Sequence, residues 1–100
     1  MVDERKILSL IYEKRTEILR IASKYGASDV RIFGSVARGE ENPESDVDLL
    51  VTLEPGRSLL DRASLMLELE KLLGVRVDVA TEKSLKDRIR RQIIKNAIPV

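Results

Sequence analysis

The sequence predicts a single domain of the α/β (α+β) class, in which helices cover a small mixed sheet of three or more strands mainly on one face. Three observations lead to this prediction. Amphipathic segments of helical period alternate with short valine-rich segments of period two, in the order αβαβαβα. Glycine or proline-glycine turns punctuate these segments. The 100 residues contain no repeat and no long linker, so residues 1–100 are treated as one domain.

The first half of the chain is predicted to contain a long helix, a strand and a short helical turn. Apolar residues recur near helical spacing across residues 3–25, so this segment is expected to form one amphipathic helix that stops at Gly26. Residues 29–33 alternate as a strand, and residues 35–38 are expected to make a short helical turn. The polar loop that follows contains Pro43, which excludes a continuous helix or a central strand there.

Two more strands and two helices are predicted in the second half. Residues 46–53 and 75–80 each place valine or leucine on one face and mainly polar residues on the other, as half-buried strands do. A helix is expected over residues 59–73, closed by Gly74, and a final helix carries an apolar stripe across residues 85–97. Two capping-box patterns are expected to begin these helices, Ser58 with Asp61 and Ser84 with Asp87.

The composition excludes several kinds of chemistry. Cysteine and histidine are both absent, which removes disulfides, thiolate nucleophiles, zinc sites and imidazole acid–base catalysis, so carboxylates must carry any reaction. The net charge of +1 argues against a general nucleic-acid binder, and no direct nucleic-acid binding is expected. No apolar run approaches the ~18 residues of a membrane span, and the first residues lack a signal-peptide core. The chain is therefore expected to be cytoplasmic and not associated with a membrane.

Three aspartates are candidates for one shared site. Asp46 and Asp48 stand two apart on a predicted strand, so their side chains point to the same side with Cα atoms roughly 6.5 Å apart. Asp78 lies on the polar face of the next predicted strand. If both strands bury their valine faces under the same helices, the three carboxylates converge within reach of one metal pair. Clustered carboxylates repel one another, and Mg²⁺ is the natural cation to offset that repulsion because it prefers hard oxygen ligands.

A glycine-serine turn stands just upstream of the aspartate pair. Gly34 lets a phosphate approach the backbone, and Ser35 at a helix start offers a hydroxyl and free N–H groups to an anion. Together with the acids, the turn indicates a site for Mg²⁺ and a nucleoside triphosphate. Each motif alone has a simpler interpretation, namely an ordinary strand-to-helix turn, a solvated strand entry, or an Asp78 that pairs with Arg76 or Arg31.

The ordered set GSVARG, SDVDLLV and RVDVAT resembles the nucleotidyltransferase superfamily of DNA polymerase beta, in particular the minimal nucleotidyltransferase (MNT) proteins of prokaryotes. The resemblance covers nearly the whole chain and implies the nucleotidyltransferase fold. It also implies that Asp46 and Asp48 are ligands of two Mg²⁺ ions. By the same resemblance, Asp78 is the third carboxylate and a further metal ligand, which helps to activate the attacking hydroxyl.

The resemblance implies further roles and a reaction. Gly34 and Ser35 match the family's triphosphate-binding turn, and Arg38 matches a position that is often basic, with either a phosphate or the acidic loop as its partner. The reaction would be in-line attack of an acceptor hydroxyl on the α-phosphorus of ATP, which releases pyrophosphate and leaves AMP on the acceptor. Two metal ions would stabilise the incoming and leaving oxygens.

The resemblance implies a partner as well. Many MNT proteins are antitoxins encoded beside a HEPN-domain toxin, so a HEPN toxin is expected to be both the binding target and the acceptor of AMP, at a tyrosine. Two alternatives stay open. The chain would neutralise its partner by binding alone, without catalysis, or it would transfer a nucleotide to a small molecule such as an aminoglycoside antibiotic. The lack of a second domain to hold a small acceptor counts against the last alternative.

Two surface features remain. Residues 83–97 hold six basic side chains against one acidic side chain, which indicates a solvated helix face, with contact to an acidic partner or nucleic acid as the alternative. The helix over residues 59–73 carries more apolar residues than one stripe needs. Burial within the domain is the expectation for them, and docking of a toxin or of a second copy of the chain is the alternative.

Overall fold

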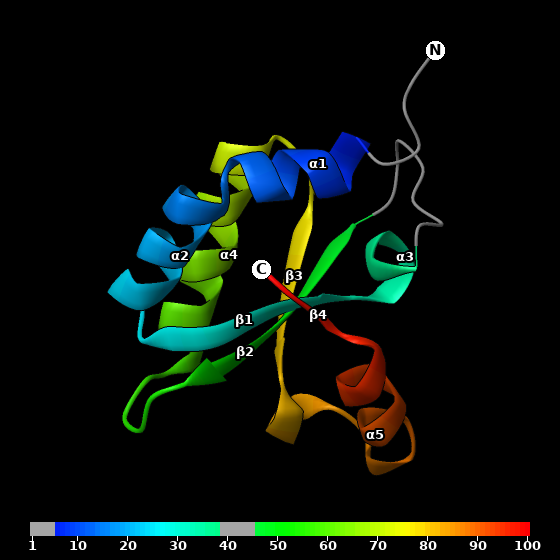
Figure 1. The fold of residues 1–100 in the computed structure, drawn as a ribbon. Helices are drawn as coiled ribbons and strands as arrows, with labels where there is room; N and C mark the ends of the chain where they lie inside the picture. Colours follow the sequence, from blue (N-terminus) through cyan, green and yellow to red (C-terminus); the bar gives the residue numbers. More distant parts are fainter. Residues whose placement is uncertain (1–5, 39–45) are drawn as a thin grey trace.

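The computed structural model describes residues 6–38 and 46–100, and its centre is a four-stranded sheet (Figure 1). The elements follow in the order α1 (Lys6–Glu13), α2 (Arg15–Lys24), β1 (Ala27–Phe33), α3 (Gly34–Ala37), β2 (Val47–Leu53), α4 (Leu59–Leu73), β3 (Val77–Thr81), the 3₁₀ helix η1 (Glu82–Ser84), α5 (Asp87–Asn96) and β4 (Ile98–Pro99). The predicted class is confirmed. The predicted loop with Pro43 and residues 3–5 of the predicted first helix lie outside the described residues.

The strands lie side by side in the order β3-β2-β1-β4. The sheet is mixed, as predicted, because β2 runs parallel to β3 while β1 runs antiparallel to both β2 and β4. The sequence did not indicate β4, since two residues are too few to show a period of two. Its Pro99 is tolerated because an edge strand can do without one N–H donor. Other strand bounds differ from the prediction by one or two residues, as strand ends commonly do.

The main core lies between the sheet and helices α1, α2 and α4, which gather on one face (Figure 1). Alternate residues of β2 and β3 point into this core, and the helices meet them with isoleucine and leucine; the buried set includes Val47, Leu49, Val51, Val77, Val79, Ile11, Ile18, Leu65 and Leu69. Because strand residues alternate between faces, the aspartates that stand between these valines point to the opposite side of the sheet.

The opposite face of the sheet is covered in part. Leu50 is fully buried on this face, although it stands outside the main core cluster. Two residues of β1 that flank the buried Ile32 connect this face to the chain after β3. Arg31 forms an ion pair with Glu82 of η1, Nη2 to Oε2 3.0 Å, and Phe33 lines a small pocket together with α5. The helices therefore lie mainly on one face, with η1 and α5 on the other.

The single helix predicted over residues 3–25 is wrong, because the helix bends at Lys14 into α1 and α2. α1 crosses above the sheet and α2 turns down beside α4 (Figure 1). The sequence contains the reason. A straight amphipathic helix needs an apolar residue three or four positions after the buried Ile11, but the chain has Lys14 and Arg15 there. With nothing to hold its middle against the core, each half packs its own apolar face.

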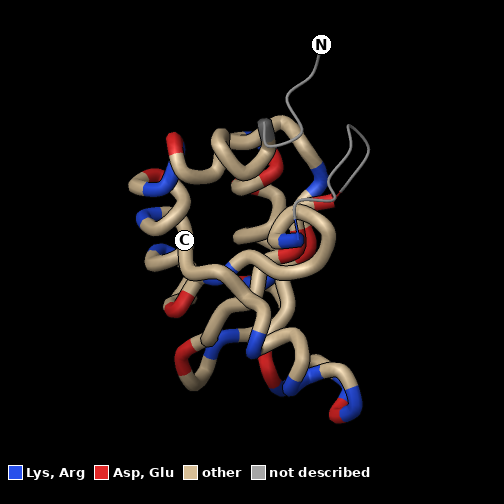
Figure 2. Tube along the Cα trace, turned by 45° about the vertical axis from the view of Figure 1, so that its right-hand side comes forward, with Lys and Arg blue, Asp and Glu red and all other residues tan. Residues whose placement is uncertain are grey.

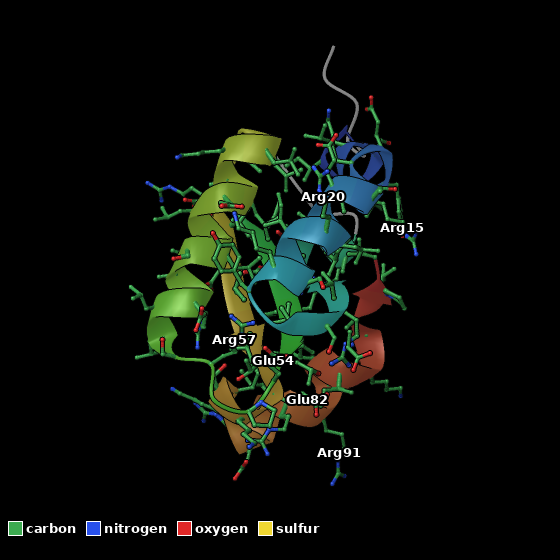
Figure 3. All side chains as sticks on the ribbon, turned by 90° about the vertical axis from the view of Figure 1, so that its left-hand side faces the viewer. Arg15, Arg20, Glu54, Arg57, Glu82 and Arg91 are labelled. Atoms are coloured by element: carbon green, nitrogen blue, oxygen red, sulfur yellow. The ribbon has the colours of Figure 1, made fainter. Side chains whose placement is uncertain are left out.

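The bounds predicted for α4 are confirmed, and so is its first cap. The Ser58 side chain accepts a hydrogen bond from a backbone N–H of the first turn, and Asp61 accepts one from the Ser58 N–H, Oδ2 to N 3.1 Å. Arg57 stands beside Glu54 at the lower end of the helix (Figure 3), with Nε 2.6 Å from Glu54 Oε1. The helix ends at Gly74, which adopts the left-handed conformation, φ +71°.

The second predicted capping box, Ser84 with Asp87, is wrong. Ser84 is instead the last residue of η1, where its hydroxyl bonds back to both the N–H and the C=O of Thr81. A hydroxyl engaged in this way cannot cap the next helix. α5 begins after Lys86 without a side-chain cap, and Arg90 holds the joint by donating to the carbonyl oxygens of Glu82 and Leu85.

Asp61→Asn is expected to lower stability at neutral pH, and the deficit should vanish in acid. The hydrogen bond from the Ser58 N–H, and then the Arg57 charge, lower the pKa of Asp61. A carboxyl with a lowered native pKa contributes stability above its unfolded pKa of about 3.9, and that contribution is lost as the pH falls through the native pKa. Melting temperatures of both proteins between pH 7 and pH 2 would check this.

Ser58→Ala is the matched control, because it removes a cap that does not titrate. The free energy of unfolding of Ser58→Ala should be lower than that of the native protein by about 1 kcal/mol, and this difference should be nearly constant over the same pH range. A deficit of Asp61→Asn that is equally constant would contradict the electrostatic account of this cap.

None of the helices in residues 6–38 and 46–100 is long and apolar enough to cross a membrane.

Candidate active site

The sheet register brings two of the predicted aspartates together. Asp48 of β2 and Asp78 of β3 are direct partners in the parallel ladder, so their side chains leave the sheet on the same face of neighbouring strands. Asp46 stands immediately before β2 and is exposed, as is Asp78, while Asp48 is half-buried. The structure thus groups all three acids at the end of the sheet where β2 and β3 begin.

The glycine-serine turn reaches the same place from the other side. Phe33, the last residue of β1, is the antiparallel partner of Asp48, and the chain turns there into α3. Gly34 adopts φ +76°, and a Cβ atom built on it would collide with Asp48 Oδ2. Two independent features therefore require glycine at this position. Ser35 follows in the first turn of α3 and is half-buried.

The acids form an electrostatically unfavourable group. Burial raises the pKa of Asp48, and the negative charges of Asp78 and Asp46 raise it further, while Arg38 acts in the opposite direction. Arg38 is the residue that follows α3, so its charge faces the acids from the turn. A cation among these carboxylates would relieve their repulsion. The acidic loop, the other partner considered for Arg38, lies outside the described residues.

The donor set fits magnesium. Carboxylate oxygens are the hard ligands that Mg²⁺ prefers, and the ion is commonly held by one or two carboxylates together with substrate phosphates and water. In the described part of the chain, no three acidic side chains stand close enough to form a complete metal site by themselves. Asp48 lies against the glycine-serine turn, and Asp46 stands two positions before it in the sequence. A metal ion shared between these carboxylates and the phosphates of a substrate would therefore suit the arrangement.

The simpler interpretation of Asp78 as an ion-pair partner of Arg31 is not what the structure shows. Arg31 pairs with Glu82. The six basic residues that follow β3 recur along η1 and α5, in the lower part of Figure 2. All of them except Arg90 are exposed, and Arg91 extends away from the fold (Figure 3). This surface is a solvated helix face.

A small pocket adjoins the turn, and the sequence analysis did not predict it. It has a volume of about 90 Å³ and is lined by Phe33, Gly34, Ala37, Arg38, Gln92, Ile93 and Asn96. The contribution of α5 could not be anticipated, because nothing in residues 87–96 ties that helix to a turn more than fifty positions earlier. The only visible signal was the i, i+4 spacing of Gln92 and Asn96, which puts two amides on one helix face.

The chain is similar to known proteins over most of its length. Residues 15–100 match the family described as Nucleotidyltransferase domain. The chain is 41% identical over 90 residues to a candidate protein adenylyltransferase of Methanocaldococcus jannaschii, which covers 90% of this chain and 97% of that protein. It is 35% identical over 100 residues to the protein adenylyltransferase MntA of Thermococcus cleftensis, and this alignment covers 100% of this chain and 98% of that protein.

Solved structures share the fold. A candidate minimal nucleotidyltransferase superposes with a TM-score of 0.84 at 50% identity, over 93% of this chain and 95% of that one. A toxin-antitoxin crystal structure with AMP-PNP superposes with a TM-score of 0.71 at 20% identity, over 84% of this chain and 69% of that one, a likeness that concerns the fold alone. The match over residues 15–100 and the full-length relatives lead to one conclusion: the chain belongs to the nucleotidyltransferase domain family.

Proposed function

We propose that the protein transfers AMP from ATP to a hydroxyl group of a partner protein in a magnesium-dependent reaction. The observation that carries this proposal is the meeting of the Gly34 turn with Asp48, directly opposite Asp78 in the sheet. A triphosphate on the turn and acids beside it are what in-line transfer at a phosphorus atom requires. Membership of the nucleotidyltransferase domain family supports the same reaction class.

Each residue has a proposed part in that reaction. Asp46 and Asp48 hold the metal ions, and the turn at Gly34 and Ser35 binds the triphosphate through the backbone and the serine hydroxyl. When bound, Mg²⁺ neutralises charge on the phosphates and on the attacking and leaving oxygens. Asp78 accepts the proton of the acceptor hydroxyl as that oxygen bonds to the α-phosphorus. The bond to the bridging oxygen breaks, pyrophosphate leaves, and AMP remains on the acceptor.

The proposed acceptor is a toxin of the HEPN class, and the protein is its antitoxin in the cytoplasm. One relative is named protein adenylyltransferase MntA. In each of two toxin-antitoxin crystal structures, one chain shares the fold of this protein. Asp46 and Asp78 are exposed, which leaves them open to a protein surface. Attachment of AMP would add a charged group to the toxin and so alter the toxin's active site.

Neutralisation by binding alone is the second candidate, and a specific observation favours it. Three leucines of α4 are strongly exposed, Leu59 at 78%, Leu60 at 75% and Leu67 at 55%. Leu60 and Leu67 stand two helical turns apart on one face of α4, and a contiguous exposed apolar patch is typical of a contact surface. The two candidates differ in what a catalytically inactive protein does.

The deciding experiment combines the protein with ATP, Mg²⁺ and the toxin encoded beside it, and follows both AMP on the toxin and the toxin's activity. We expect AMP to appear on the toxin and its activity to fall in parallel. The same mixture without ATP should leave the toxin active. Full neutralisation without ATP would instead establish binding alone as the function.

Asp78→Ala is expected to reduce transfer by about 10²- to 10⁴-fold, the usual range for loss of a general base, while ATP binding is largely kept. Asp78 is exposed and stands on β3, which β2 separates from the turn at the end of β1, so its loss leaves the phosphate contacts in place. The rate of AMP transfer checks the first expectation, and the ATP affinity measured by calorimetry checks the second. Asp87→Ala, which removes an acid of α5 that is 92% exposed, is the control and should change neither. Unchanged turnover in Asp78→Ala would refute this role.

A further inference from the structure

The small pocket beside the Gly34 turn has no part in the function proposed so far. It lies between the end of β1 with α3 on one side and α5 on the other. Two of its lining residues, Gly34 and Arg38, belong to the candidate active site, and Gly34 abuts the Asp48 carboxylate. Whatever occupies this pocket therefore lies next to the group that is bound at the turn.

The walls of the pocket combine apolar surface with two amides. Phe33 is the only phenylalanine of the chain, and it lines the pocket together with Ala37 and Ile93. Gln92 and Asn96 stand one helical turn apart on α5 and line the same pocket. Neither amide side chain bonds to another residue in the described part of the chain, so both are available to a ligand.

This chemistry matches a nucleobase. Bases stack on aromatic side chains, because every base presents a flat π-face. Asparagine and glutamine offer a donor and an acceptor together, which pairs with the N6 amino group and N7 of adenine. Guanine presents two acceptors at the corresponding edge, and a guanidinium suits those better. Arg38 also lines the pocket, but it follows α3 directly and its backbone N–H donates to the Gly34 carbonyl oxygen, so this guanidinium stands beside the turn, where phosphate oxygens suit it.

We propose that this pocket is the nucleobase subsite, in which Gln92 and Asn96 select adenine while Phe33 and Ile93 hold the ring. The inference rests on the proposed function, because the pocket adjoins the turn that is proposed to bind the triphosphate. The volume of about 90 Å³ suits one planar ring system and excludes a whole nucleotide, whose phosphates would remain outside at the turn.

The test measures binding, so that it does not depend on an acceptor. The affinities of ATP, GTP, CTP, UTP and inorganic tripolyphosphate are determined by calorimetry with Mg²⁺, for the native protein and for the double variant Gln92→Met, Asn96→Leu. These replacements keep the size of exposed side chains and remove only the amides, so folding should be preserved. Ser23→Ala, an exposed neutral change on α2, is the control.

The native protein should bind ATP about 5- to 150-fold more tightly than CTP or UTP, which is the usual discrimination by one good bidentate contact. The double variant should lose this preference through weaker ATP binding, while CTP, UTP and tripolyphosphate bind as before. Equal affinity for all four nucleotides, or unchanged ATP binding in the variant, would overturn the inference. So would a variant that binds ATP normally but uses the acceptor poorly, since the pocket would then serve the acceptor.

Failure of the proposed function would look different. In that case tripolyphosphate and all four nucleotides would fail to bind, or would bind equally well after Asp46 and Asp48 are replaced. If the triphosphate binds with Mg²⁺ but all four nucleotides bind equally well, only the assignment of the nucleobase subsite is wrong.

Discussion

Replacement of both Asp46 and Asp48 by asparagine is expected to abolish nucleotidyl transfer. Asparagine keeps the size of each side chain but removes the negative charge that would hold Mg²⁺. Metal ions contribute several kcal/mol to the stabilisation of charge in such transition states, which corresponds to a loss of about 10³-fold or more in rate. Transfer of AMP to the acceptor, measured at saturating ATP and Mg²⁺, is the test. Glu13→Gln, which removes an exposed acid on α1, should leave the rate unchanged.

The same double variant should not be less stable than the native protein when metal is absent. Burial, Asp78 and Asp46 raise the native pKa of Asp48, so the folded protein binds this proton more tightly than the unfolded chain does. Stability from such a group is greatest below the unfolded pKa and is lost as the pH rises through the native pKa. At neutral pH the ionised Asp48 therefore opposes folding, and asparagine removes that opposition. A clearly lowered melting temperature in the variant would show that the carboxylates serve the fold instead.

Gly34→Ala is expected to have the second-largest effect, through geometry rather than charge. A Cβ atom at this position would collide with Asp48 Oδ2, so either the carboxylate or the turn must move. Misplacement of reacting groups by about 1 Å is enough to lower a rate by about 10²-fold. The left-handed backbone at φ +76° adds a stability loss of about 1–2 kcal/mol for any residue with a side chain. Transfer rates and chemical unfolding measure the two losses separately.

Gly74→Ala is the matched control for this prediction. Gly74 has nearly the same backbone conformation, φ +71°, but a Cβ atom there would meet nothing within 4 Å. It should lose stability to a similar extent and keep its transfer rate. Equal rates for Gly34→Ala and Gly74→Ala would contradict the proposed contact between the turn and Asp48.

The sequence predicted those parts of the fold that depend on local patterns. The bounds of α4 followed from a capping box at Ser58 and a left-handed glycine at Gly74, both of which act within one helical turn. The sheet class followed from the alternation of valines in β2 and β3. The candidate site was predictable to the same extent, because Asp48 and Asp78 stand at fixed points of these strands and the strand register decides their neighbours.

The features that were missed depend on contacts between distant parts of the chain. The bend at Lys14 coincides with a gap in the apolar pattern, but the neighbours on which the two helix halves pack are set by the rest of the fold. Ser84 bonds to Thr81 rather than capping α5, a competition between two local partners that only the backbone path decides. β4 forms because β1 has a free edge for it. The pocket between Phe33 and Asn96 exists only once α5 lies against the turn.

The central claim is that this site transfers AMP to a protein acceptor. The most direct measurement supplies the protein, Mg²⁺ and the toxin with ATP labelled in either the α- or the γ-phosphate, and then determines which label becomes covalently bound to the toxin. We expect incorporation of the α-label, with release of the γ-label in pyrophosphate, and neither label bound when Asp46 and Asp48 are replaced by asparagine. Incorporation of the γ-label, or of no label while the toxin is fully neutralised, would contradict it.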